Sequence, residues 1–159
     1  MRKTSFPGID TTPTRRLLAD HRMIRKILEG IRPGPPRLGE LLKTLRRAVL
    51  AHAWFENEVL LPGIRQEGFW MNCFLDEIVV EHTDIEKLLD RLLKFRHPPT
   101  ERFSAILTQL KGVLNAHFLK EEEALFPLTE ERLSPQALQR LSAEMNRRQS
   151  EARRFSTGN

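Results

Sequence analysis

Two glutamates and four of the five histidines in the chain stand at spacings that suit a metal site. Two segments share the form His-x3-Glu-x-Glu-x-Leu-x-Pro, at residues 52–62 and 117–127. In each segment a glutamate, Glu56 or Glu121, follows the histidine by four residues, so both side chains lie on one face of a helix. Imidazole nitrogen and carboxylate oxygen are donors that suit iron, manganese and zinc.

A lone histidine stands in front of each segment. His21 precedes the first segment by 31 residues, and His82 precedes the second by 35. The chain therefore has two similar halves, each predicted to be a helical hairpin that supplies a lone histidine and a His-x3-Glu pair. This repeat predicts a site with pseudo-two-fold symmetry in the middle of the molecule. The fifth histidine, His97, stands beside two prolines and is expected in an exposed loop.

The two glutamates indicate a cation, because they stand on the faces that form the core. A carboxylate inside a helical core costs several kcal/mol unless a cation or strong hydrogen-bond donors compensate for it. No Lys or Arg stands on the same face beside either glutamate. Four imidazole nitrogens and four carboxylate oxygens are enough donors for two ions. The predicted metal ligands are His21, His52, Glu56, His82, His117 and Glu121.

Helices must position these residues, because apolar side chains recur every three or four positions along most of the chain. A hydroxyl residue followed by proline marks a helix start at Thr12 and again at Ser134. A histidine falls within the apolar face of each of the first four helices. The expected helices cover about residues 12–30, 38–61, 70–95, 100–126 and 134–154, with the second and fourth ending at Pro62 and Pro127.

Long amphipathic helices with short connections predict an all-α fold, an up-down-up-down four-helix bundle with an additional C-terminal helix. The 159 residues are enough for one domain. We expect an N-terminal lead over residues 1–12, the bundle over residues 13–127, and the C-terminal helix and tail over residues 128–159. The apolar face of the last helix predicts that it packs on the bundle or mediates a dimer, so the protein is a monomer or a homodimer.

The composition excludes several other classes of site. The single cysteine rules out a disulfide scaffold and a four-cysteine metal site, and the absence of tyrosine rules out tyrosyl-radical chemistry. No apolar run approaches the roughly 18 residues of a membrane span, and the first residues do not resemble a signal peptide. We expect a cytoplasmic protein with no membrane partner.

The net charge of +5 raises the question of a nucleic-acid partner. The arginines occur in scattered pairs, with no aromatic residues between them on which bases would stack. We expect these arginines on solvated helix faces, which does not favour nucleic acid as a partner. The basic end of the last helix is a surface on which an acidic redox partner protein would dock.

The paired segments and the lone histidines resemble the hemerythrin-like family in its His-His-Glu cation-binding form, over about residues 14–127. The resemblance implies a non-haem centre of two iron ions joined by an oxo or hydroxo bridge, although manganese or zinc suits the same donors. The implied ligands are His21 and His52 on one ion, His82 and His117 on the other, and Glu56 and Glu121 as bridges to both.

One further candidate ligand is Glu86. Oxygen-carrying members of the family have a histidine four residues after the one that His82 matches, and this chain has Glu86 there. A carboxylate at that position would favour the ferric state and disfavour reversible oxygen binding. The alternative is that Glu86 pairs with Lys87 or Arg91 at the surface, while Ile85 takes the place in the core.

The surroundings of the ligands are also expected to contribute. Glu58, Glu122 and Glu123 are predicted to be solvated or to accept hydrogen bonds from histidine N–H groups. The aromatic residues Trp54 and Phe118, beside the two segment histidines, are expected to pack around the site or to exclude water from it.

Open coordination positions on an iron pair allow Lewis-acid and redox chemistry together. We therefore expect a protein that binds or reacts with a small oxidant, namely oxygen, nitric oxide or peroxide, in sensing, iron handling or the response to oxidative or nitrosative stress. One alternative is a di-iron enzyme with catalase-like peroxide activity or nitric oxide reductase activity. Another is a basic bundle that binds nucleic acid and in which the metal is structural.

Overall fold

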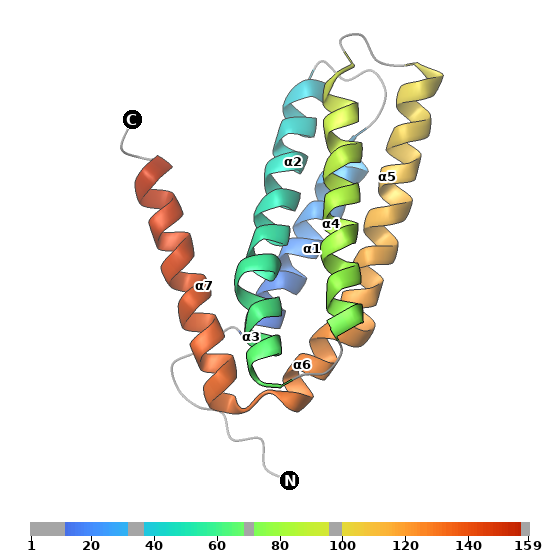
Figure 1. Ribbon diagram of the computed structural model, residues 1–159. Coiled ribbons are helices and arrows are strands. Elements are labelled where there is room, and N and C mark those ends of the chain that lie inside the picture. The colour runs from blue at the N-terminus through green and yellow to red at the C-terminus, as the bar shows by residue number, and fades with distance from the viewer. Residues whose placement is uncertain (1–11, 32–36, 69–71, 96–99, 157–159) are drawn as a thin grey trace.

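The fold is a bundle of long helices, seen in a computed structural model that describes residues 12–31, 37–68, 72–95 and 100–156. These residues contain no strand, and none of their helices is long and apolar enough to cross a membrane. The predicted all-α four-helix bundle is confirmed. In Figure 1 four helices run up-down-up-down side by side, namely α1 (Pro13–Gly30), α2 (Leu38–Phe55), α4 (Asn72–Leu93) and α5 (Glu101–Lys120).

Hydroxyl side chains cap three helices at their N-termini. Thr12 accepts a hydrogen bond from the backbone N–H of Arg15 at 3.3 Å, and Pro13 occupies the first turn of α1. Thr100 and Ser134 accept in the same way from the residues three positions further on, at 3.1 Å each. A capping hydroxyl satisfies one of the N–H groups that the first turn leaves unpaired, and it contributes about 1 kcal/mol.

The second and fourth helices do not end at Pro62 and Pro127, so this prediction was wrong. Each helix passes through a π turn into one further short α-helix. Because a π turn has already replaced the usual hydrogen bonds to the fourth preceding residue, the proline that follows it disrupts less of the helix. The added elements are η1 (Glu56–Leu60) and α3 (Leu61–Gln66) after α2, and η2 (Glu121–Leu125) and α6 (Phe126–Arg132) after α5.

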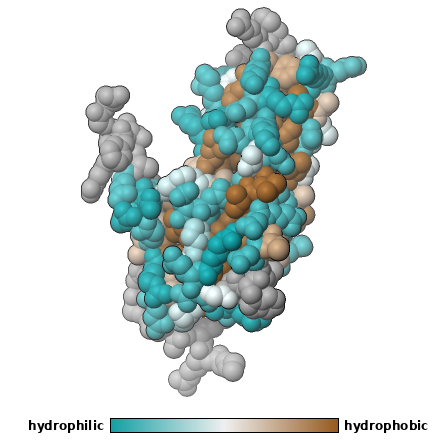
Figure 2. Space-filling model, in the orientation of Figure 1, coloured by the Kyte–Doolittle hydropathy of each residue, from teal (hydrophilic) through white to brown (hydrophobic). Residues whose placement is uncertain are grey.

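Two clusters of buried apolar residues fill the bundle, one at each end, while hydrophilic residues cover most of the face seen in Figure 2. On α1, Leu17 belongs to one cluster and Ile24 to the other. On α4, Ile78 and Ile85 are divided in the same way. The residues between the clusters include the four predicted histidines, so a polar layer separates two apolar cores. The expected loop residue His97 and the expected start of the third helix at residue 70 lie outside the described residues.

The additional helix α7 (Pro135–Ser156) folds back beside the lower end of the bundle (Figure 1). Its residues Ala137 and Met145 are buried in the same apolar cluster as Leu17. Gly63 of α3 lies so close to Leu141 of α7 that a Cβ atom at position 63 would collide with the leucine side chain. The helix therefore packs on the bundle, which is the first of its two expected roles.

The close approach of Gly63 to Leu141 can be tested against a second helical glycine. Gly112 of α5 has open space where a Cβ would stand, so Gly112→Ala should raise the free energy of unfolding by about 1 kcal/mol. Gly63→Ala should gain less than this or lose stability, because its methyl group displaces Leu141. Urea denaturation followed by circular dichroism measures both, and an equal gain for the two variants would show that α7 does not pack as described.

Candidate metal centre

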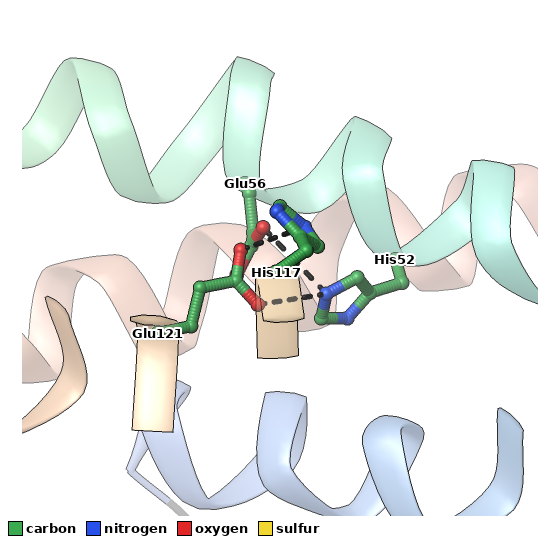
Figure 3. Close-up of side chains that lie close together, drawn as sticks. All are labelled: His52, Glu56, His117 and Glu121. Carbon is green, nitrogen blue, oxygen red and sulfur yellow. Dashed lines mark ion pairs between the residues drawn. The ribbon is translucent and has the colours of Figure 1, made fainter. Parts of the chain in front are cut away.

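Six polar side chains from the four bundle helices meet in the layer between the two apolar clusters. All six are buried, with between 0% and 6% of their surface exposed. Four of them are drawn in Figure 3, where the two carboxylates and two imidazoles point toward one another. Each of these four offers one donor atom, and the donor atoms all lie within 4.8 Å of one another. The residues in Figure 3 are His52, Glu56, His117 and Glu121.

The local helix structure places the two carboxylates in equivalent positions. Glu56 and Glu121 are the first residues of the two π turns. The carbonyl of each glutamate accepts a hydrogen bond from the N–H five residues later, at Leu61 and Phe126. Single π turns inside α-helices occur frequently at functional sites. Here both turns begin at the residues whose side chains enter the polar layer.

Glu121 lies between two pairs of histidines. Its Oε2 atom is 3.0 Å from Nε2 of His21 and 3.7 Å from Nε2 of His52. Its Oε1 atom is 3.0 Å from Nε2 of His117 and 3.9 Å from Nε2 of His82. Each oxygen of this one carboxylate therefore faces a different pair.

The histidines themselves form the same two pairs. The Nε2 atoms of His21 and His52 are 3.2 Å apart, and the ring centres of His82 and His117 are 4.7 Å apart. Glu56 also lies between the pairs, with Oε2 at 3.1 Å from Nε2 of His82 and 3.6 Å from Nε2 of His52. The structure thus brings together all six residues predicted from the repeat.

Several oxygen and nitrogen atoms of this cluster that could bind a metal have no hydrogen-bond partner within the described part of the chain. They include both carboxylate oxygens of Glu56 and of Glu121, and Nε2 of His82 and of His117. Leaving a buried polar atom unpaired costs about 1–3 kcal/mol, and more for a charged group. Oxygen and imidazole donors that are buried and unpaired together fit a bound cation, since a cation satisfies all of them at once.

The protonation of the cluster without a cation follows from its burial. Burial and the neighbouring Glu121 raise the pKa of Glu56 well above its ordinary value. Burial acts in the same direction on Glu121, but the adjacent imidazoles of His117 and His21 outweigh it and hold the pKa of Glu121 well below its ordinary value. Burial and His117 lower the pKa of His82 to about 3. A proton on Glu56 therefore removes a negative charge that a bound metal ion would otherwise balance.

The outward-facing nitrogens of three histidines have hydrogen-bond partners. Nδ1 of His21 lies 2.7 Å from Glu122, as one of the sequence predictions proposed. Nδ1 of His117 lies 2.8 Å from Glu81, and Nδ1 of His82 lies 2.9 Å from Oδ1 of Asn57. Such partners orient a ligand histidine and raise its basicity. Glu58 and Glu123, the other two predicted partners, are exposed.

Sequence reasoning missed the partners Asn57 and Glu81, and it also missed Asp20, whose Oδ2 is 3.9 Å from Nδ1 of His52. The repeat contained a signal for them. Asp20 and Glu81 each stand directly before a lone histidine, and Asn57 stands directly after a core glutamate, in the same place as Glu122 in the second half. Equivalent positions in a repeat reach equivalent places in the fold.

The structure does not bring Glu86 into the cluster. Its side chain is 44% exposed and lies 3.2 Å from Nη2 of Arg46 on α2, while Ile85 is buried. Arg46 also pairs with Asp90 at 2.8 Å. The rotation of α4 that places His82 and Ile85 in the core turns Glu86 to the surface, because consecutive residues of a helix point in different directions.

Phe118 separates the cluster from a hollow on the protein surface. Its ring stacks on the imidazole of His21, with the ring centres 3.9 Å apart and the planes at 18°. Phe118 also lines an open hollow of about 240 Å³ between α1 and α5. Arg25 and Lys111 line the same hollow. Trp54, the other aromatic residue expected near the site, is 40% exposed.

Comparison with known proteins adds three findings. The model of a family described as "Hemerythrin HHE cation binding domain" matches residues 12–129, and also residues 73–156. A DNA nickase of Nostoc sp. is 26% identical over 110 residues, which are 69% of this chain and 30% of that protein. The chain therefore spans less than a third of the length of that relative. No solved structure matches the chain.

The raised pKa of Glu56 predicts that this residue destabilises the metal-free protein at neutral pH. A carboxyl group whose pKa is raised on folding stabilises the protein most below its unfolded value of 4.5, and this contribution is lost as the pH rises. Glu56→Gln should therefore stabilise the metal-free protein at neutral pH, because the amide has no charge to bury, and the difference should vanish below about pH 4.5. Thermal melts in the presence of a chelator measure this, and a less stable variant at neutral pH would contradict it.

Proposed function

The chain belongs to the hemerythrin HHE cation-binding family, and on that premise we propose that it holds two iron ions in its bundle and binds or reacts with a small oxidant. The oxidant is oxygen, nitric oxide or peroxide. The observation that carries the proposal is the orientation of Glu121, because its two oxygens face two separate histidine pairs. A carboxylate in that position has the arrangement of a bridge between two cations.

The proposed ligands follow from these pairs. Glu56 lies against one histidine of each pair and is the second proposed bridge. Iron bound there would supply Lewis-acid and redox chemistry. Glu86 is left out of the proposed ligand set, because it is paired with Arg46 at the surface. The remaining assignments are His21 with His52 for one ion and His82 with His117 for the other.

The chain's own residues prepare the site for a small reactant. The two apolar clusters on either side of the polar layer exclude water from it. The hollow between α1 and α5 leads toward His21, and the ring of Phe118 closes it. Only a small molecule can move past the ring of Phe118 without a large movement of the helices. This supports a diatomic molecule or peroxide as the reactant.

The ligand set predicts which side chains determine the iron content. Glu121→Gln removes the charge that faces both histidine pairs, so it should reduce the iron content from two ions per chain to less than one. Glu86→Gln removes an equivalent charge from the surface of α4 and should leave the content unchanged. Elemental analysis of protein that is purified anaerobically and reconstituted with Fe(II) measures both variants.

Exposure of the same samples to air provides a second readout. A bridged ferric pair has strong charge-transfer absorption in the near ultraviolet, while zinc has none, so the spectrum also distinguishes iron from zinc. Unchanged iron content and absorption in Glu121→Gln would overturn the proposed centre.

The enzymatic alternative is a reaction of the same centre with turnover. The amount of peroxide, or of nitric oxide with a reductant, that the iron-loaded protein consumes per site distinguishes binding from catalysis. Consumption of one equivalent or less per site corresponds to a binding or sensing protein. Continued consumption, lost in Glu121→Gln, corresponds to a peroxide-disproportionating or nitric oxide-reducing enzyme.

A second candidate function is an action on DNA, which the name of the Nostoc relative favours. The charges on the described surface argue against it, because many arginines are neutralised by acidic partners. Arg147 and Arg148 both pair with Glu144, and Arg46 pairs with Asp90. DNA binding would have to weaken steeply with salt, and nicking of a supercoiled plasmid would have to persist in the presence of a chelator for it to be independent of iron chemistry.

A further inference from the structure

The two halves of the chain differ in the residue that directly follows the core glutamate. In the second half this residue is Glu122, a carboxylate that lies 2.7 Å from Nδ1 of His21. In the first half it is Asn57, a neutral amide whose Oδ1 lies 2.9 Å from Nδ1 of His82. The two contacts are equivalent by the repeat, and each joins a lone histidine to the opposite hairpin. They differ in charge, and this is a property of the amino-acid sequence.

The residues that directly precede the lone histidines make a second pair of contacts. Glu81 lies 2.8 Å from Nδ1 of His117, within hydrogen-bond distance, while Asp20 is 3.9 Å from Nδ1 of His52, which is near enough for its charge to act but too far for a hydrogen bond. Both are carboxylates. The pair of His21 and His52 therefore has two carboxylate neighbours, Glu122 and Asp20. The pair of His82 and His117 has one, Glu81.

Cations do not cancel this difference. Arg25 lies 2.7 Å from Glu122, and Lys120 pairs with both Glu81 and Glu77. Each pair of histidines therefore has one basic residue beside its outer carboxylates. The pair of His82 and His117 remains the one with fewer carboxylates facing its Nδ1 atoms, because His82 faces the amide of Asn57.

Outer carboxylates matter because of the hydrogen bond that they accept. An imidazole that binds a metal through Nε2 donates its Nδ1–H outward, and a carboxylate acceptor makes it a stronger donor to the metal than an amide does. Loss of such a partner typically costs about 10- to 100-fold in metal affinity. His82, which donates to an amide, is therefore the less basic of the two lone histidines toward a cation.

We propose that the two cation positions are unequal, and that Asn57 is the positioning residue that makes the position of His82 and His117 the weaker one. This inference rests on the proposed function, because it requires two metal ions. It assigns different roles to the two halves of a nearly symmetric site. The position of His21 and His52 fills first and holds its ion, and the other fills last and loses its ion most readily.

The test is a titration of the metal-free protein with Fe(II) under anaerobic conditions, in competition with a coloured chelator. The wild-type protein should take up two Fe(II) in two steps of different affinity. Asn57→Asp has nearly the same shape as the wild-type residue and supplies the missing carboxylate, so it should tighten the second step by about 10- to 100-fold and merge it with the first. Glu122→Gln should weaken the first step by a similar factor.

A charge placed elsewhere serves as the control. Gln109→Glu adds one negative charge of the same kind on the exposed face of α5 and should leave both steps unchanged. Melting of each metal-free variant shows whether a change in affinity reflects unfolding. The Mössbauer spectrum of the iron-loaded wild type should contain two distinct quadrupole doublets, which approach each other in Asn57→Asp.

The outcomes separate the two proposals. Uptake of two Fe(II) with equal affinity by the wild type, or no effect of Asn57→Asp on the second step in a folded variant, overturns the inequality and leaves the iron centre intact. Uptake of fewer than two Fe(II) by the wild type overturns the iron pair itself, and the inference with it.

Discussion

The burial of two carboxylates among four imidazoles is the constraint on which the rest of this structure depends. Glu56 and Glu121 are fully buried, and the ion pairs that the described structure gives them are with histidines. Charge of this kind is tolerated in a core only when it is compensated. Each of the four helices accordingly supplies one histidine at the same height, and the apolar core is divided into a cluster above and a cluster below.

This constraint explains why the six central residues were predictable from the sequence. Each of them interrupts an apolar face at a spacing of three or four residues, so its burial follows from the helix period alone. The repeat then places His52 with Glu56, and His117 with Glu121, in equivalent positions of two hairpins. No detail of side-chain packing is needed for that step, because the period and the repeat act together.

The predictions that were wrong depend on structural details that the helix period alone does not contain. The helices continue past Pro62 and Pro127 because two π turns precede the prolines, and a pattern that assumes regular α-helix does not contain a π turn. Glu86 was a candidate because it follows His82 by one turn. Its exclusion depends on how α4 is oriented about its own axis, which buries Ile85 and places Glu86 beside Arg46 at the surface. Asn57 was missed although it stands in the first half where Glu122 stands in the second.

The six central residues follow the two-fold repeat, whereas their outer hydrogen-bond partners do not. The π turns, the core glutamates and the histidine pairs repeat from one half to the other, since each half must bring the same donors to one layer. The outer partners carry no such requirement, because they lie at the edge of the core, where an amide and a carboxylate are both tolerated. In the proposed iron centre, divergence at these positions would change how strongly each half attracts a cation, without disturbing the packing that holds the halves together. A duplicated hairpin can in this way make two chemically different metal positions from one repeated design.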